Sequence, residues 1–187
     1  TKQLLERIRE GTLDAAIAAT PLDEDKVLER VLYYEPFMAY ITPASELHLK
    51  QEITPEDLSN ENILLLEDGH CFRNNVLNLC PNKSEKEDKN FTIESGSFET
   101  LVHLSNEGMG ITLLPYLHSK NMSKDDQKNL RNFVAPAPAR AISMIYHENK
   151  LKLHIIDALH QLINGIVRAA IAFEDIKIVS PKNTSVR

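Results

Sequence analysis

Short apolar runs alternate along this chain with segments whose apolar residues recur at helical spacing, and this alternation restricts the fold more than any other feature. A short apolar run between turn residues predicts a buried strand, whereas helical spacing predicts a helix with one apolar face. Strands that alternate with helices are typical of α/β proteins with largely parallel sheets. The strands expected on this basis are residues 13–19, 37–41, 63–66, 91–93, 111–114 and 142–146.

The chain is expected to open on a helix. Leu4, Leu5 and Ile8 follow helical spacing, Thr1 stands at the cap position, and Gly11 suits the left-handed residue just beyond a helix end. A parallel α/β domain usually begins with a strand. We therefore expect the chain to be the remainder of a longer protein.

Two further helix starts carry a cap residue. Thr54 precedes Pro55 and then acidic residues, which complement the positive end of a helix dipole. Ser97 can cap a helix that runs through Leu104 and ends before Gly108. Both segments therefore predict helices between the strands.

The last predicted helix spans residues 151–173. Polar residues fall largely between its apolar positions, so one apolar face is expected to cover a sheet. The residues of that face are Ile155, Leu159, Leu162, Ile166 and Ala170.

Composition limits the class of function. The 187 residues are 42% hydrophobic and 26% charged, as in an ordinary globular protein. No apolar run of about 18 residues and no signal-peptide core occurs in the sequence as given, so we expect a cytoplasmic chain that does not enter membranes. A formal net charge of −6 argues against direct contact with nucleic acid. Residues 83–89 are expected to form a solvated loop, and residues 180–187 a frayed tail.

The chemistry is expected around the two cysteines, Cys71 and Cys80. A strand ends at Leu66, a turn follows, and apolar residues then recur at helical spacing, which puts Cys71 near a helix N-terminus. The helix dipole, together with His70 or Arg73, can lower the pKa of a thiol there. Such a thiolate is open to oxidation to a sulfenic acid, with which a second thiol can condense.

The spacing of the two cysteines suggests a switch. Nine helical residues separate their Cα atoms by about 13 to 14 Å, whereas a disulfide needs about 5.5 to 6 Å. A bridge must therefore unwind part of the helix. In the loop-entropy model, a disulfide that closes a ring of this length stabilises the bridged state by about 2.7 kcal/mol. Unwinding part of the helix can cost a similar free energy.

Other interpretations of the cysteines remain open at this point. Two cysteines at this spacing are most often buried, inert apolar residues. A zinc site of His70, Cys71 and Cys80 lacks an evident fourth ligand. A nucleophilic Cys–His pair needs a base that faces the thiol, whereas a sequence neighbour normally points elsewhere.

Several motifs resemble those of the LysR-type transcriptional regulators. Residues 65–73, LLEDGHCFR, together with Cys80, closely resemble the redox segment of the peroxide-sensing members of that family. Residues 10–17, EGTLDAAI, look like the "G-x-L-D" passage of LysR-type effector domains. Residues 98–101 and then 108–115, GMGITLLP, resemble their second signature. The sequence departs from this pattern at Pro81 and the charged run that follows.

The resemblance implies an α/β fold with two lobes, similar to type 2 periplasmic binding proteins, with mixed sheets and two crossovers near residues 33–36 and 135–141. Residues 1–34 plus 139–178 would form lobe I, without its N-terminal part, and residues 35–138 lobe II with the cysteines. Residues 179–187 would be a tail. The DNA-binding domain of the family would lie outside this chain.

The resemblance also implies residue roles. Cys71 matches the peroxidatic cysteine, and Cys80 matches the resolving cysteine with which it forms a disulfide. Thr1 could equally be only a helix cap, and Arg140 only a surface charge. The residues that match activating or peroxide-binding neighbours are Thr1, His70, Arg73 and Arg140.

The function so implied is that of a hydrogen peroxide sensor that controls oxidative-stress genes. The partners would be a second copy of the chain, as a homodimer or tetramer, DNA through the N-terminal domain, and RNA polymerase in the full protein. No metal or cofactor is expected, and the chain would not be an enzyme. The alternatives are a LysR-type domain that only binds a small-molecule effector and a thiol peroxidase that turns over peroxide.

Overall fold

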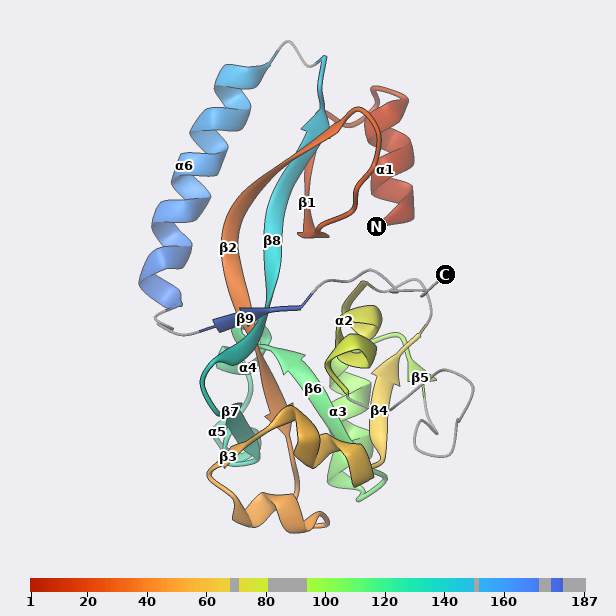
Figure 1. Cartoon of the computed structure of the whole chain (residues 1–187), viewed down its shortest axis with the longest axis vertical. Helices are drawn as coiled ribbons and strands as arrows, with labels where there is room; N and C mark the ends of the chain where they lie inside the picture. Colours follow the sequence, from red (N-terminus) through yellow and green to blue (C-terminus); the bar gives the residue numbers. More distant parts are fainter. Residues whose placement is uncertain (68–70, 81–93, 150–151, 172–175, 180–187) are drawn as a thin grey trace.

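The computed structural model of the chain describes residues 1–67, 71–80, 94–149, 152–171 and 176–179. Figure 1 shows two lobes, one above the other, that share two long strands. These strands are β2 (Val27–Tyr40) and β8 (Ala137–His147). They pair antiparallel from Val27 opposite His147 to Pro36 opposite Ala139, so the junction of the lobes is a continuous two-stranded ribbon.

The first lobe, at the top of Figure 1, is a small sheet with a helix on each face. The edge strand β1 (Ala15–Thr20) pairs antiparallel with β8. On one face, Leu5 and Ile8 of α1 (Lys2–Arg9) pack against Ile145. On the other face, α6 (Leu153–Ala170) contributes the buried side chain of Ile156.

The second lobe is built on the far half of β2. There β2 pairs antiparallel with β6 (Ile111–Pro115), which continues in parallel pairing to β4 (Ile63–Leu66) and then β5 (Glu94–Ser95). At the other side, β7 (Leu130–Phe133) joins β2 to β3 (Glu52–Ile53). Its helices are η1 (Glu46–Leu49), η2 (Pro55–Asn60), α2 (Cys71–Leu79), α3 (Phe98–Asn106), α4 (Tyr116–Lys120) and α5 (Lys124–Gln127), and β9 (Ile176–Ile178) pairs with β8.

Most of the expected strands are confirmed, and 63–66 has the predicted bounds. The run 91–93 lies outside the described residues. The expectation of largely parallel sheets is wrong, because the longest pairings, of β2 and β1 with β8, are antiparallel. Parallel pairings join β4 to β5 and β6, β3 to β7, and β8 to β9, so the sheet is mixed, as the resemblance implies.

The expected helix starts differ in how they are capped. The Ser97 hydroxyl accepts a hydrogen bond from the Thr100 amide at the start of α3, as predicted. Thr54 and Asp57 form a reciprocal capping box, but the helix that follows, η2, is a 3₁₀ helix. Thr1 occupies the cap position of α1 without a side-chain cap hydrogen bond. Gly11 is left-handed, with φ of 74°, as the sequence predicts.

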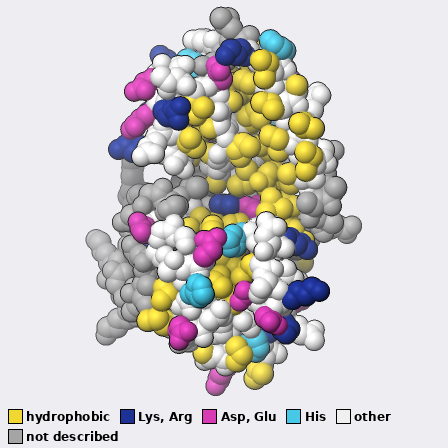
Figure 2. Space-filling view, turned by 180° about the vertical axis from the view of Figure 1, so that it is seen from behind, with side chains coloured by type: hydrophobic (Ala, Val, Ile, Leu, Met, Phe, Trp, Pro, Cys, Tyr) yellow, Lys and Arg dark blue, Asp and Glu magenta, His cyan; other side chains and the backbone are white. Residues whose placement is uncertain are grey.

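The expectation for the apolar face of α6 is wrong. Ile156 is 2% exposed and faces the sheet, but the four described apolar side chains of the predicted face remain uncovered. Figure 2 shows hydrophobic side chains gathered over this side of the first lobe. The uncovered residues are Ile155, Leu159, Leu162 and Ile166.

The contacts of α6 give the physical reason for this orientation. The rotation of the helix places Ile156 on the sheet, and in this position Arg30 pairs with Asp157 and the His160 ring bonds the Val31 carbonyl. Ile163 packs beside Ile156 on the sheet. The predicted apolar face therefore points away from the sheet and remains exposed. In the described residues, no helix is both long and apolar enough to cross a membrane.

Candidate functional site

The helix α2 lies directly after β4, as the sequence predicts. The strand ends at Leu66, α2 begins at Cys71, and Cys80 follows its last residue. The Cys80 amide still bonds the Val76 carbonyl, at 3.2 Å, so the helical hydrogen bonding reaches the second cysteine. The two cysteines therefore stand at opposite ends of one helix.

The helical backbone keeps the two cysteines apart. By the rise per residue their Cα atoms are about 13 to 14 Å apart, more than twice the span of a disulfide, about 5.5 to 6 Å. Cys80 is buried in the core of the second lobe. A bridge between the cysteines therefore requires the helix to open.

The apolar face of α2 anchors it in the second lobe. Phe72, Val76 and Leu79 are all less than a tenth exposed and pack in the same core as Cys80. The ring of Phe72 lies 5.3 Å from that of Phe37 and 5.0 Å from that of Phe98, which it meets edge-on. Opening the helix must release these contacts.

Arg140 lies against the first turn of α2. Its guanidinium carbon is 4.8 Å from the centre of the Phe72 ring. Its Nε and Nη2 donate to Glu35 Oε2 at 3.0 and 2.7 Å, and the other oxygen of Glu35 accepts from the Leu117 amide at 3.1 Å. The ion pair is nearly buried, with side chains 14% and 4% exposed. Arg140 is therefore held in place at the junction of the lobes.

The pairing of the two long strands creates this ion pair. Glu35 on β2 stands opposite Arg140 on β8. The charge of Glu35 also adds to burial in raising the pKa of the Tyr33 hydroxyl nearby. Sequence reasoning missed Glu35, because an acidic residue inside a strand ordinarily indicates an exposed position.

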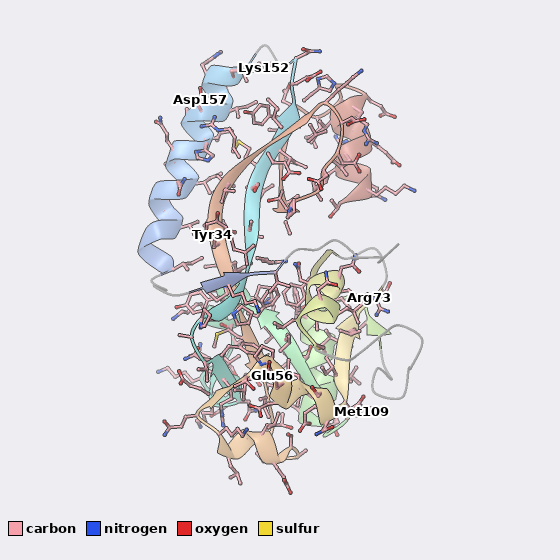
Figure 3. All side chains as sticks on the ribbon, in the orientation of Figure 1. Tyr34, Glu56, Arg73, Met109, Lys152 and Asp157 are labelled. Atoms are coloured by element: carbon pink, nitrogen blue, oxygen red, sulfur yellow. The ribbon has the colours of Figure 1, made fainter. Side chains whose placement is uncertain are left out.

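Two further predicted site residues, Arg73 and Thr1, lie in the described part of the chain. Arg73 Nη1 donates to the Leu66 carbonyl at 3.4 Å, which ties the first turn of α2 to the end of β4. Thr1 is the cap residue that precedes α1 in the first lobe, at the end of that helix that faces the second lobe in Figure 1. His70 and the side chain of Cys71 lie outside the described part of the chain. Arg73 thus belongs to the first turn of α2 (Figure 3), and the structure brings Arg140 of β8 against that turn.

Asn75 is a second residue that the sequence did not indicate. It is fully buried in the middle of α2, and its Nδ2 donates to the Val179 carbonyl at 2.9 Å. Val179 follows β9, so this bond joins α2 to the segment beside β8. A polar residue in a helix usually faces solvent, so only the packing identifies this role.

The fold and this site define a class of protein. The sequence matches the LysR substrate binding domain over residues 1–166, and the chain belongs to that family. It is 33% identical over 146 residues to the "DNA-binding transcriptional dual regulator OxyR" of Escherichia coli and to a "Probable hydrogen peroxide-inducible genes activator" of Mycobacterium leprae. Each match covers 78% of this chain and 47% of the relative, so the chain spans about half the length of these relatives.

Solved structures agree with this assignment. The reduced regulatory domain of OxyR from Pseudomonas aeruginosa is 32% identical, with a TM-score of 0.75 over 88% of this chain and 78% of that one. A mutant OxyR from Porphyromonas gingivalis has a TM-score of 0.83 at 23% identity, over 96% of this chain and 82% of that one. The second likeness concerns the fold alone.

Proposed function

We propose that this chain is the redox-sensing regulatory domain of a LysR-type transcriptional regulator that responds to hydrogen peroxide. The observation that carries the proposal is the placement of two cysteines at opposite ends of one helix, with Cys80 buried and Arg140 against the first turn. The similarity to proteins named as hydrogen peroxide-inducible genes activators supports it.

The proposed chemistry has two steps. The Cys71 thiolate attacks one oxygen of hydrogen peroxide, the O–O bond breaks, and the hydroxide that leaves takes up a proton to become water. Cys71 is then a sulfenic acid. The Cys80 thiol condenses with it, forming the disulfide and releasing a second water. Peroxide is reduced, and two thiols are oxidised.

The conformational step follows from the distances. A disulfide can close only if α2 opens, which removes Phe72 and Val76 from the core of the second lobe. The chain-entropy gain of the bridge, about 2.7 kcal/mol, is similar to the loss of a few packing contacts and hydrogen bonds. Such a near balance allows a reversible change between two conformations.

We assign supporting roles to the neighbouring residues. His70, Arg73 and Arg140 would lower the pKa of the Cys71 thiol and stabilise the leaving hydroxide by their charge or hydrogen bonds. Thr1 would bind peroxide from the first lobe. The contact of Arg140 with Phe72 supports its assignment, because Phe72 adjoins Cys71 in the chain.

The proposal extends to the whole protein. Residues 1–34 plus 139–178 would form lobe I, residues 35–138 lobe II, and residues 179–187 a tail. A further N-terminal domain would bind DNA, and RNA polymerase would be a partner in the cytoplasm. The regulatory domains would associate as a homodimer or tetramer, and the uncovered apolar side of α6 supports contact with further protein. The chain would act as a regulator and not as an enzyme.

Intact mass with thiol labelling, before and after one equivalent of hydrogen peroxide, tests the proposal. We expect both thiols to be lost with a decrease of two hydrogen masses, and no further consumption of peroxide unless a reductant resets the protein. With a thiol reductant present, consumption of many equivalents of peroxide at the rate of the first oxidation would indicate a thiol peroxidase instead. Two thiols that stay unreacted would indicate a domain that only binds a small-molecule effector.

A further inference from the structure

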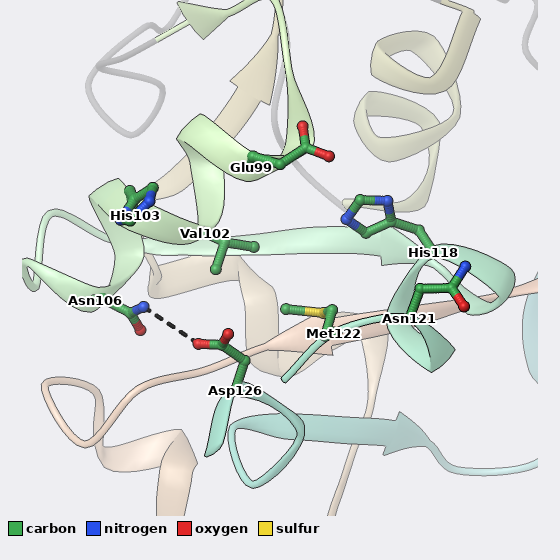
Figure 4. A pocket seen from close by; sticks show the side chains of 8 residues that line it. All are labelled: Glu99, Val102, His103, Asn106, His118, Asn121, Met122 and Asp126. Atoms are coloured by element: carbon green, nitrogen blue, oxygen red, sulfur yellow. Dashed lines mark hydrogen bonds between the residues drawn. The ribbon is translucent and has the colours of Figure 1, made fainter. Parts of the chain in front are cut away.

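A pocket of about 460 Å³ opens on the outer side of the second lobe, between α3, α4 and α5 (Figure 4). This volume is in the range of small-molecule sites in proteins. Its lining includes neither the Glu35–Arg140 pair nor residues of α2, although α4, which carries His118, also bonds Glu35 through the Leu117 amide. Neither the family nor the proposed function accounts for it.

The pocket has two carboxylates and an apolar floor. Figure 4 shows Glu99 of α3 and Asp126 of α5 on opposite sides, with Val102 and Met122 between them. All the residues that line the pocket are described, and none is a lysine or an arginine. Besides the carboxylates, the lining holds two histidines, His103 and His118, which are largely neutral at pH 8. At that pH the lining therefore offers two negative charges separated by apolar surface.

Both carboxylates are held in the ionised form. A hydrogen bond from the Ser123 hydroxyl, and a further one from the Tyr40 hydroxyl, keep the pKa of Asp126 below its ordinary value. Bonds from its own amide and from Ser97 do the same for the pKa of Glu99. A ligand with positive charge at both ends therefore complements the two carboxylates of the pocket.

We propose that this pocket binds a short linear aliphatic diamine, whose two ammonium groups pair with Glu99 and Asp126 while its methylene chain lies over Val102 and Met122. An ammonium group supplies three hydrogen-bond donors to each carboxylate, and the methylenes bury against the floor. A monoamine would satisfy only one carboxylate. Among the described residues, no group of three or more histidine, cysteine or acidic side chains could hold a metal ion, so a diamine fits better than a divalent cation.

The pocket is connected to α2 by a row of rings. Phe72 meets Phe98 at 5.0 Å edge-on, and Phe98 lies 5.0 Å from the ring of His118, which lines the pocket. Loss of Phe72 from the core would remove the support of this wall. The diamine should therefore bind best while α2 is folded and, because coupling is reciprocal, should favour the reduced state. This second part rests on the proposed redox function.

Binding to the reduced chain tests the site itself. With 1,4-diaminobutane and 1,5-diaminopentane as probes at pH 8, calorimetry or NMR titration should give saturable binding that butylamine and 1,4-butanediol lack. Glu99→Gln and Asp126→Asn should each weaken it about fivefold, the effect of one partly exposed ion pair. Glu107→Gln at the end of α3 and Asp125→Asn beside Asp126 are the matched controls, both without effect.

Two outcomes of this titration overturn the site: equal affinity for butylamine and diaminobutane, or unchanged affinity in Glu99→Gln. Asp126→Asn also removes hydrogen bonds from Ser123 and Tyr40, so its folding is checked by thermal melting. Glu99 is exposed on α3 and keeps the test valid if that variant unfolds.

The connection to α2 is tested without peroxide and then with it. Phe72→Leu should weaken diamine binding at least about fivefold, whereas Val76→Ala on the same helix should not. Unchanged affinity in Phe72→Leu would refute the connection. In the disulfide form the loss should be similar. If peroxide forms no disulfide, the proposed redox function is wrong, but the diamine titration of the reduced chain and the Phe72→Leu result remain valid. If the disulfide forms and the affinity for the diamine is unchanged, only the coupling between the pocket and α2 is wrong.

Discussion

The guanidinium of Arg140 lies 4.8 Å from the ring of Phe72, which directly follows Cys71. This contact links the junction of the lobes to the first turn of the thiol-bearing helix. Glu35 holds Arg140 by two hydrogen bonds, so Phe72 packs against the cation of a buried ion pair. The same ring packs against Phe98 on the side of α3, so α2 touches both halves of the molecule through one residue.

The first prediction concerns the reactive thiol. Cys71 starts a helix near Arg73 and Arg140. The pKa of its thiol should therefore be lower than about 8.5, the reference value for cysteine, and lower than the pKa of the Cys80 thiol. Thiol labelling as a function of pH in Cys71→Ser and Cys80→Ser variants measures both pKa values. If Cys80 titrates lower and reacts first with peroxide, the assignment of the peroxidatic cysteine is wrong.

The second prediction concerns unwinding. In the disulfide form, amides of residues 72–79 should lose protection from hydrogen exchange, whereas those of β6 should keep it, because only α2 must open. In the Cys80→Ser variant, Cys71 should still be oxidised, but the amides of α2 should keep their protection. The reason is that a sulfenic acid, unlike a disulfide, does not require the two residues to approach each other. Equal protection in the reduced and disulfide forms would rule out the switch.

The third prediction concerns the buried ion pair. Glu35→Gln leaves Arg140 charged and nearly buried, and should lower the free energy of unfolding by about 3 to 5 kcal/mol in urea titrations. Adding Arg140→Met should recover part of that loss. As a control, Asp157→Asn breaks the exposed pair with Arg30 and should cost less than about 1 kcal/mol. If Glu35→Gln costs no more than the control Asp157→Asn, the buried pair does not stabilise the fold.

The fourth prediction concerns pH. The hydrogen bond from Lys50, and a second one from the Thr54 amide, lower the pKa of Asp57 in the folded state. A lowered folded pKa adds stability above the unfolded pKa, about 3.9, and this is lost as pH falls through the folded value. Asp57→Ala should therefore cost about 1 kcal/mol at pH 7 and progressively less below about pH 4.

A matched variant controls for charge alone. Asp125→Ala removes an acid that is 89% exposed and should change the free energy of unfolding little at any pH. Urea titrations at several pH values measure both variants. A cost for Asp57→Ala that is the same at pH 7 and pH 3 would contradict the assigned role of its carboxylate.

The sequence determined the local features of the site. The strand 63–66, the helix after the turn and the cap at Ser97 depend on residues within a few positions of one another. The separation of Cys71 and Cys80 also followed from sequence, because a helix fixes distance by residue count. The resemblance to the LysR-type regulators then supplied the two-lobed arrangement.

Tertiary structure decided what depends on distant partners. The rotation of α6 places Ile156 and Ile163 on the sheet, where Asp157 and His160 also meet β2, and not the apolar face that the sequence predicts. Glu35 became a buried partner of Arg140 because β2 and β8 pair in that register. Apolar periodicity indicates that a helix has an apolar face, but contacts with distant segments decide which face is buried. In the same way, contacts between distant segments decide which charged residues form a buried pair.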